Sequence, residues 1–74
     1  NRRVVSIAAS DIRRVWISVY APPSYADNFD VLIDLGGREL WVEQLSDEAA
    51  ARELATTIAR YLGVHCEPEL RRKG

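Results

Sequence analysis

The sequence predicts an α+β fold, in which an antiparallel sheet of about four strands forms a meander and one amphipathic C-terminal helix packs on one face. Three observations favour this fold. Alternating runs of β-branched and aromatic residues occupy the chain up to Glu43. A Gly-Gly pair separates two of these runs. An apolar stripe at helical spacing follows them.

The length of 74 residues predicts one small domain covering residues 1–74. Because the chain starts with Asn1 and contains no Met, we expect it to be a piece of a longer protein. The single cysteine, Cys66, cannot form an internal disulfide, which fits a reducing compartment or a thiol without a redox role. Hydrophobic residues make up 47% of the chain, so we expect a folded domain rather than a disordered one.

The charges are nearly balanced, with ten Lys and Arg against eleven Asp and Glu. We therefore expect no nucleic-acid partner, because such partners normally require a clearly basic face. The sequence contains no apolar run of the roughly 18–20 residues that cross a bilayer. Basic residues lie near both ends, which indicates either solvated termini or charges flanking a membrane segment. These residues are Arg2, Arg3, Arg71, Arg72 and Lys73.

The first two expected strands are Val4–Ala9 and Val15–Tyr20. The second is ambiguous, because apolar residues in the segment 12–20 also recur at helical spacing. We favour a strand, since β-branched side chains lose χ1 freedom in a helix and pack well on a pleated sheet. The prolines then predict a loop over Pro22–Asn28.

A hairpin is the clearest local prediction. Asp30–Leu35 and Arg38–Glu43 flank Gly36 and Gly37, and two glycines suit a two-residue turn that needs positive φ. This turn predicts cross-strand pairs on two faces. On the aliphatic face, where the helix should pack, the pairs are Leu35–Arg38, Ile33–Leu40 and Val31–Val42. On the other face they are Leu32–Trp41, Asp34–Glu39 and Asp30–Glu43.

The helix is predicted over Asp47–Leu62. Ser46 is the expected N-cap, acidic residues occupy the first turn, and Gly63 follows as the C-terminal cap. We expect residues 65–74 to be flexible. The apolar stripe that should face the sheet consists of Ala51, Leu54, Ala55, Ile58 and Leu62.

One helix covers one face of a sheet, so the other face should carry a residual apolar patch. Alternation places Arg14, Trp16 and Tyr20 on that face if Val15 and Ile17 face the helix. Three outcomes stay open: the first strand and the Pro-rich loop bury the patch, a second copy covers it as a homodimer, or it binds another partner or ligand. The candidate interaction residues are Trp16, Tyr20, Leu32, Trp41 and Arg14.

No pattern in the sequence predicts catalysis, a metal or a cofactor. His65, Cys66 and Glu67 are consecutive, so their side chains diverge, and no second His completes a site. Asp27, Asp30 and Asp34 have no nucleophile beside them, and a solvated strand face explains them. We therefore expect a protein that is not an enzyme.

The segment Val31–Val64 has a recognisable order: strand, Gly-Gly turn, strand, then Ser-Asp-Glu-Ala entering a helix that ends Ala-Arg-Tyr-Leu-Gly-Val. It resembles the C-terminal half of bacterial PH-like domains found beside transmembrane helices in small membrane proteins. The resemblance implies a non-enzymatic assembly or binding module on the cytoplasmic side of a membrane. A PH fold has seven strands and we find four, which implies a truncated variant or a sheet completed by another subunit.

The functional prediction is a non-catalytic interaction module that associates with itself through the uncovered aromatic face. We expect it in the cytoplasm or on the cytoplasmic side of a membrane protein. The alternative is a peripheral lipid- or ligand-binding domain that uses Arg13, Arg14 and the terminal arginines.

Overall fold

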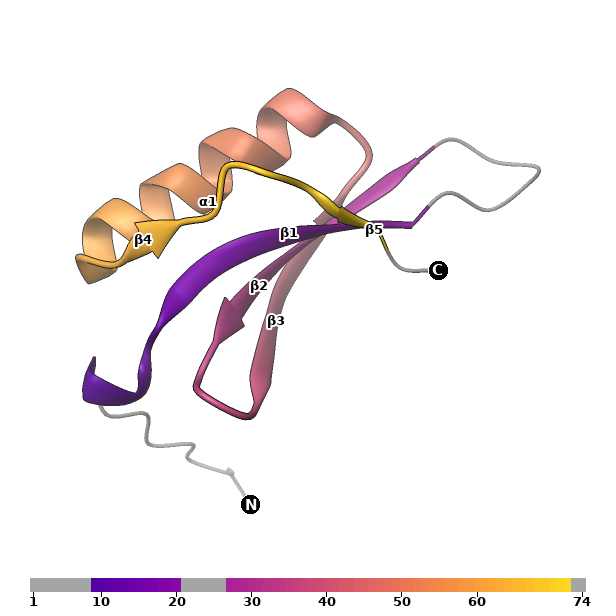
Figure 1. The fold of residues 1–74 in the computed structure, drawn as a ribbon. Helices are drawn as coiled ribbons and strands as arrows, with labels where there is room; N and C mark the ends of the chain where they lie inside the picture. Colours follow the sequence, from indigo (N-terminus) through magenta and orange to yellow (C-terminus); the bar gives the residue numbers. More distant parts are fainter. Residues whose placement is uncertain (1–8, 21–26, 73–74) are drawn as a thin grey trace, which may run out of the picture.

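A computed structural model of the 74-residue chain describes residues 9–20 and 27–72. Its elements are η1 (Ala9–Asp11), β1 (Arg14–Tyr20), β2 (Asn28–Asp34), β3 (Glu39–Leu45), α1 (Glu48–Leu62), β4 (His65–Cys66) and β5 (Arg71–Arg72). The strands form one sheet, and α1 lies across one of its faces (Figure 1). The predicted α+β class is therefore confirmed.

The sheet is mixed rather than purely antiparallel. Its order is β3-β2-β1-β4, and β5 also pairs with β1. The β1–β2 and β2–β3 pairs are antiparallel, as the meander predicts, but β4 and β5 run parallel to β1. Parallel pairing requires a crossover connection, and α1 provides it by leading the chain from β3 over the sheet to the free edge of β1. The prediction of an entirely antiparallel sheet is wrong in this respect.

The ambiguous segment after Ile12 forms a strand, β1, and not a helix. Its β-branched residues pair with those of β2 in an uninterrupted antiparallel register. The expected strand Val4–Ala9 lies outside the described residues except for Ala9, which begins η1. Of the expected loop Pro22–Asn28, residues 22–26 also lie outside the described part of the chain.

The hairpin between β2 and β3 has the predicted two-residue turn. Gly36 and Gly37 have φ values of 73° and 117°. The backbone N–H of Leu35 donates to the carbonyl oxygen of Arg38 at 2.8 Å, which closes the turn. Next to it, three predicted pairs are confirmed: Ile33–Leu40, Leu32–Trp41 and Asp34–Glu39.

Further along this hairpin, the register shifts between Leu32 and Val31. Val31 lies opposite Glu43 rather than Val42, so the predicted Val31–Val42 and Asp30–Glu43 pairs are wrong. One extra residue in β3 forms a β-bulge. The bulge aligns Leu45 with Phe29 on the core side, where uninterrupted alternation would instead have placed a glutamine.

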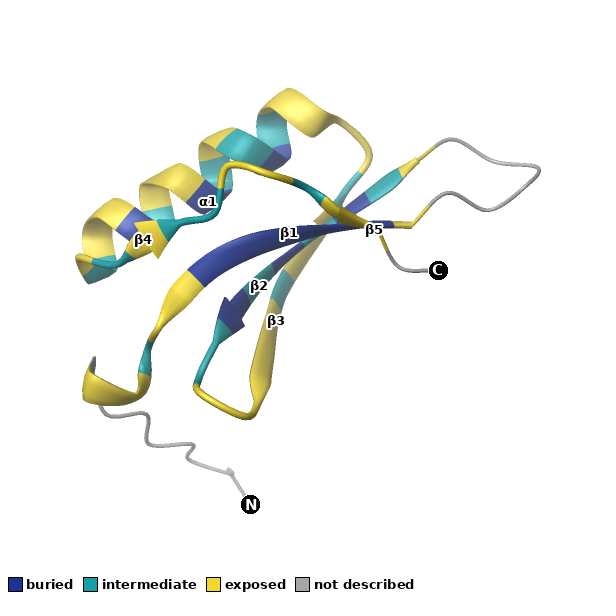
Figure 2. Ribbon diagram, in the orientation of Figure 1, coloured by how far each residue is buried: buried dark blue, intermediate teal, exposed yellow. Residues whose placement is uncertain are grey.

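The core lies between α1 and the sheet, and Figure 2 shows its buried residues on β1, β2 and the inner side of α1. Three alanines on α1 allow the helix to approach the sheet closely, while Leu54, Ile58 and Leu62 are partly buried beside them. The predicted stripe is therefore confirmed, with Ala59 added. The buried core consists of Val15, Ile17, Val19, Phe29, Val31, Ile33, Ala51, Ala55 and Ala59.

Both ends of α1 are capped. Asp47 is the N-cap, because its carboxylate accepts from the backbone N–H of Ala50 at 2.9 Å. The predicted cap, Ser46, is one residue too early. Gly63 has φ 71°, as predicted for the C-terminal cap, and the N–H of Val64 donates back into the last turn.

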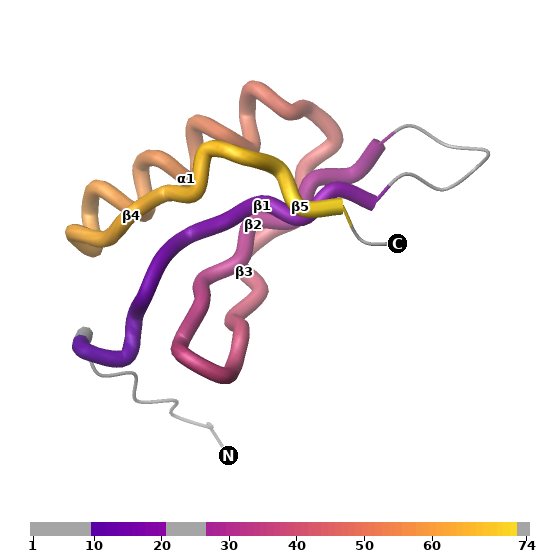
Figure 3. Tube along the Cα trace, viewed as in Figure 1, coloured from indigo at the N-terminus to yellow at the C-terminus, as the bar shows by residue number. Residues whose placement is uncertain are grey.

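The segment after α1 lies along the free edge of β1, as Figure 3 shows. The N–H of Glu67 donates to the carbonyl of Val15 at 2.9 Å, and Arg52 donates to the carbonyl of Pro68 at 2.9 Å. Cys66 and Leu70 pack against the core. We expected residues 65–74 to be flexible. Within residues 65–72 the structure has two short strands, β4 and β5, which supply partners for the backbone groups at the free edge of β1.

Candidate functional site: the open sheet face

The open face is the sheet face opposite α1. Three of its residues lie side by side across the strands: Trp16 of β1 is opposite Leu32 of β2, which is opposite Trp41 of β3. We call these three the aromatic row. Their neighbours along the strands, such as Val15, face α1 in the core. The structure thus places both indoles on the predicted face.

The two tryptophans differ sharply in exposure. Trp16 is 8% exposed, whereas Trp41 is 57% exposed. Trp16 lies on a central strand, and the guanidinium carbon of Arg71 in β5 lies 4.3 Å from its ring centroid, a cation–π geometry. Trp41 lies on the edge strand β3. The exposed part of the aromatic row is therefore at its β3 end.

Arg71 is held in this position by a second contact. Its Nη2 donates to Oε2 of Glu67 at 2.7 Å, within the segment that joins β4 to β5. The sequence indicated Arg71 only as part of a basic end. No local pattern signals its contact with Trp16, since that contact depends on β5 pairing with β1.

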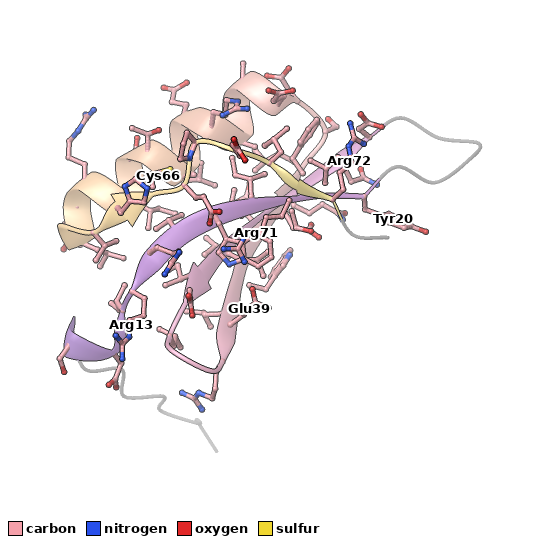
Figure 4. All side chains as sticks on the ribbon, viewed as in Figure 1. Arg13, Tyr20, Glu39, Cys66, Arg71 and Arg72 are labelled. Atoms are coloured by element: carbon pink, nitrogen blue, oxygen red, sulfur yellow. The ribbon has the colours of Figure 1, made fainter. Side chains whose placement is uncertain are left out.

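Charged residues form a second row across the three strands, next to the aromatic row and nearer the Gly36-Gly37 turn. Arg14 and Asp34 are 3.5 Å apart, and Asp34 is opposite Glu39. Arg14, which alternation placed on this face, thus lies beside this pair of acidic residues. Figure 4 shows Arg71 and Glu39 on the side of the sheet away from α1. A shallow depression of about 320 Å³ there is lined by Trp16, Asp34, Gly37, Arg38, Glu39 and Arg71.

Tyr20 lies apart from the aromatic row. It is opposite Asn28 at the far end of β1, four residues beyond Trp16, which corresponds to about 13 Å along a strand. Its side chain is 47% exposed and extends away from Arg71 and Glu39 (Figure 4). The structure thus brings together four of the five predicted interaction residues and leaves Tyr20 separate.

Two buried polar atoms on the open face, Trp16 Nε1 and Asp30 Oδ1, have no hydrogen-bond partner among the described residues. Buried polar groups are nearly always hydrogen-bonded. Asp30 lies between Ser18 of β1 and Gln44 of β3. The hydrogen-bonding capacity of these two side chains is therefore not fully met within the described part of the chain.

The other candidate groups do not converge on one site. His65 is exposed, Cys66 packs against the core, and Glu67 pairs with Arg71. Within residues 9–20 and 27–72, no three His, Cys, Asp or Glu side chains lie together as a metal site requires. Asp27 is exposed, and it does not join Asp34 in the sheet.

Comparisons with protein-family models, curated proteins and solved structures give no match for this chain. The resemblance to bacterial PH-like domains therefore stays a prediction. Across the residues that the structure describes, no helix has the length and apolar character needed to span a membrane.

Proposed function

We propose that this domain is a non-catalytic interaction module that associates with itself through the open face. The observation that carries this proposal is the exposure of Trp41, which leaves an indole in water beside Leu32 on a face that α1 does not cover. Large apolar groups gathered on such a surface normally mark an interface. Tryptophan is also among the residues that contribute most to binding energy at protein interfaces.

The sheet edge at β3 supports association less well than the face does. The edge strand carries Glu39 and Glu43, and the bulge interrupts its regular hydrogen-bonding pattern. Charged residues and bulges are the features by which natural proteins prevent strands from pairing at an edge. We therefore assign the interaction to the face of the sheet.

Peripheral lipid binding, the alternative function, has weaker support. Arg14 pairs with Asp34, and Arg71 pairs with Glu67. The depression beside them also contains Glu39. A surface of mixed charge attracts anionic lipid much less than a basic cluster does.

Trp41→Ala tests the proposal. Sedimentation equilibrium over a micromolar concentration range should show dimers for the unmodified chain and mostly monomers for the variant. The free energy of unfolding of the monomer should change little, because Trp41 is already largely exposed.

Tyr61→Ala is the matched control, since Tyr61 is an aromatic residue on α1 that is 89% exposed. It should leave association unchanged. A chain that stays monomeric throughout the range, or equal effects of the two variants, would contradict the proposal. Sedimentation with anionic vesicles at low salt, by a chain that does not dimerise, would favour the lipid-binding alternative.

A further inference from the structure

The open face is asymmetric in charge from one side to the other. At the level of Asp34 in the central strand β2, β1 contributes Arg14 and β3 contributes Glu39. Arg71 adds a second positive charge on the β1 side, because β5 pairs with the outer edge of β1 and the Arg71 guanidinium lies over the Trp16 ring. Along the line Arg14–Asp34–Glu39, the cation therefore lies on the β1 side and the outer anion on the β3 side, although Arg38 lines the depression beside Glu39.

The aromatic row has the same asymmetry. At the β1 side, Trp16 is covered by the guanidinium of Arg71, whereas at the β3 side Trp41 is bare. The Arg71 side chain is itself 45% exposed, so its outer surface is free to contact another group. A guanidinium stacks favourably on an indole face. The two ends of the row are thus complementary to each other.

We infer that two copies pack open face to open face about a two-fold axis that runs along β2, an inference that rests on the proposed self-association. This axis places β1 of one copy over β3 of the other. Arg14 then faces the partner's Glu39, and Trp41 faces the partner's Arg71. Leu32, on the axis, meets its own counterpart.

The other in-plane axis, perpendicular to the strands, gives a poorer match. It sets Arg71 against the partner's Arg71 and Asp34 against the partner's Asp30, and both are pairs of like charge. The axis along β2 also brings like charges together, because Asp34 and Asp30 each lie near their own counterparts. Each Asp34 carboxylate, however, lies 3.5 Å from the guanidinium of Arg14 in its own copy.

The size of the face predicts a weak dimer. Three strands of seven residues form a surface of about 15 by 23 Å. This is well below the roughly 800 Å² that each partner buries in a stable complex. We expect a dissociation constant in the micromolar range, which lies within the concentrations that the sedimentation experiments cover.

Charge reversal tests the axis. Arg14→Glu alone should weaken dimerisation by about tenfold, and so should Glu39→Arg alone. In each homodimer, both contacts between position 14 of one copy and position 39 of the other become repulsive. An equimolar mixture of the two variants should dimerise like the unmodified chain, since both pairs in the mixed dimer are attractive again. The double variant, R14E/E39R, should also recover dimerisation. Sedimentation equilibrium measures all four samples.

The control pair is Glu53→Arg and Arg60→Glu, which reverses the same charges at exposed positions on α1. Neither control should alter dimerisation, alone or mixed. Circular dichroism checks that each variant folds. If one single variant does not fold, the double variant still tests the pairing, because it keeps the total charge of the face. Dimers that form in all samples without recovery on mixing would overturn the axis while leaving self-association standing. Absence of dimers in the unmodified chain would overturn both.

Discussion

Arg71 contacts two residues at once. Its Nη2 lies 2.7 Å from Oε2 of Glu67, and its guanidinium carbon lies 4.3 Å from the centroid of the Trp16 ring. A cation over an indole contributes about 0.5–1 kcal/mol at an exposed site, and the aliphatic part of the side chain also covers the ring. This contact, together with the central position of β1, leaves Trp16 buried, whereas Trp41 on the edge strand β3 is exposed.

Arg71→Ala should therefore lower the free energy of unfolding by about 1 kcal/mol and shift the fluorescence of Trp16 to longer wavelength. The measurement is urea unfolding and tryptophan emission spectra in a Trp41→Phe background, in which Trp16 is the only tryptophan. Arg72→Ala is the control, because neighbouring strand residues point to opposite sides and Figure 4 shows Arg72 away from Arg71. Equal spectra for the two variants would show that Arg71 does not cover the ring.

Strand β3 joins the hairpin turn to α1, and its bulge sets which side chains reach the core. Val42 and Leu45 both pack against the core although they are three positions apart, which a regular strand does not allow. The turn sets the register as far as Leu40. The extra residue then shifts the strand by one position, so that Leu45, just before the helix, also reaches the core.

Deletion of Glu43 should leave the fold intact, with a free energy of unfolding within about 1 kcal/mol of the unmodified chain. The shortened strand would pair regularly, with Val42 opposite Val31 and Leu45 still opposite Phe29. Deletion of Val42 also removes the bulge, but it takes away a side chain that packs on the core, and it should cost about 1–2 kcal/mol more. Urea unfolding of both variants measures the difference. Equal costs would mean that the bulge itself stabilises the sheet.

The segment from β4 to β5 completes the sheet at the free edge of β1. It supplies backbone partners for β1 and two side chains, Cys66 and Leu70, for the core. Truncation after Val64 should lower the free energy of unfolding by several kcal/mol, which is most of the stability of so small a domain.

Circular dichroism and amide proton dispersion in NMR measure this effect of truncation. Leu70→Ala is a milder test and should cost about 1 kcal/mol, because the side chain is only partly buried. A truncated chain as stable as the full one would mean that this segment does not contribute to the fold.

At the scale of the whole molecule, a domain of this length buries only about 60% of the surface of its unfolded chain. The association that we propose through the open face would add stability by mass action. The Tm of the unmodified chain should therefore rise with protein concentration, and the Tm of Trp41→Ala should not. Differential scanning calorimetry at several concentrations measures this. A Tm that does not depend on concentration for either chain would count against the dimer.

Local patterns in the sequence determined much of the fold. Alternation along β1 and the Gly36-Gly37 turn placed the side chains on two faces, because pleating gives a strand a period of two. Helical spacing likewise placed the stripe of α1. These signals lie within a few residues of each other, and they assign Trp16 and Trp41 to the same side of the sheet on the condition that Val15 and Ile17 face the helix.

The tertiary structure alone decided the parallel edge strands, the bulge in β3 and the cover over Trp16. Each depends on residues distant in the chain: β5 pairs with β1 more than 50 positions away, and Leu45 takes its register from Phe29. Two-residue strands have no periodicity to detect, and a bulge is favoured only once a core exists to receive the shifted side chain. Exposure of Trp41 rather than Trp16 was thus determined by packing.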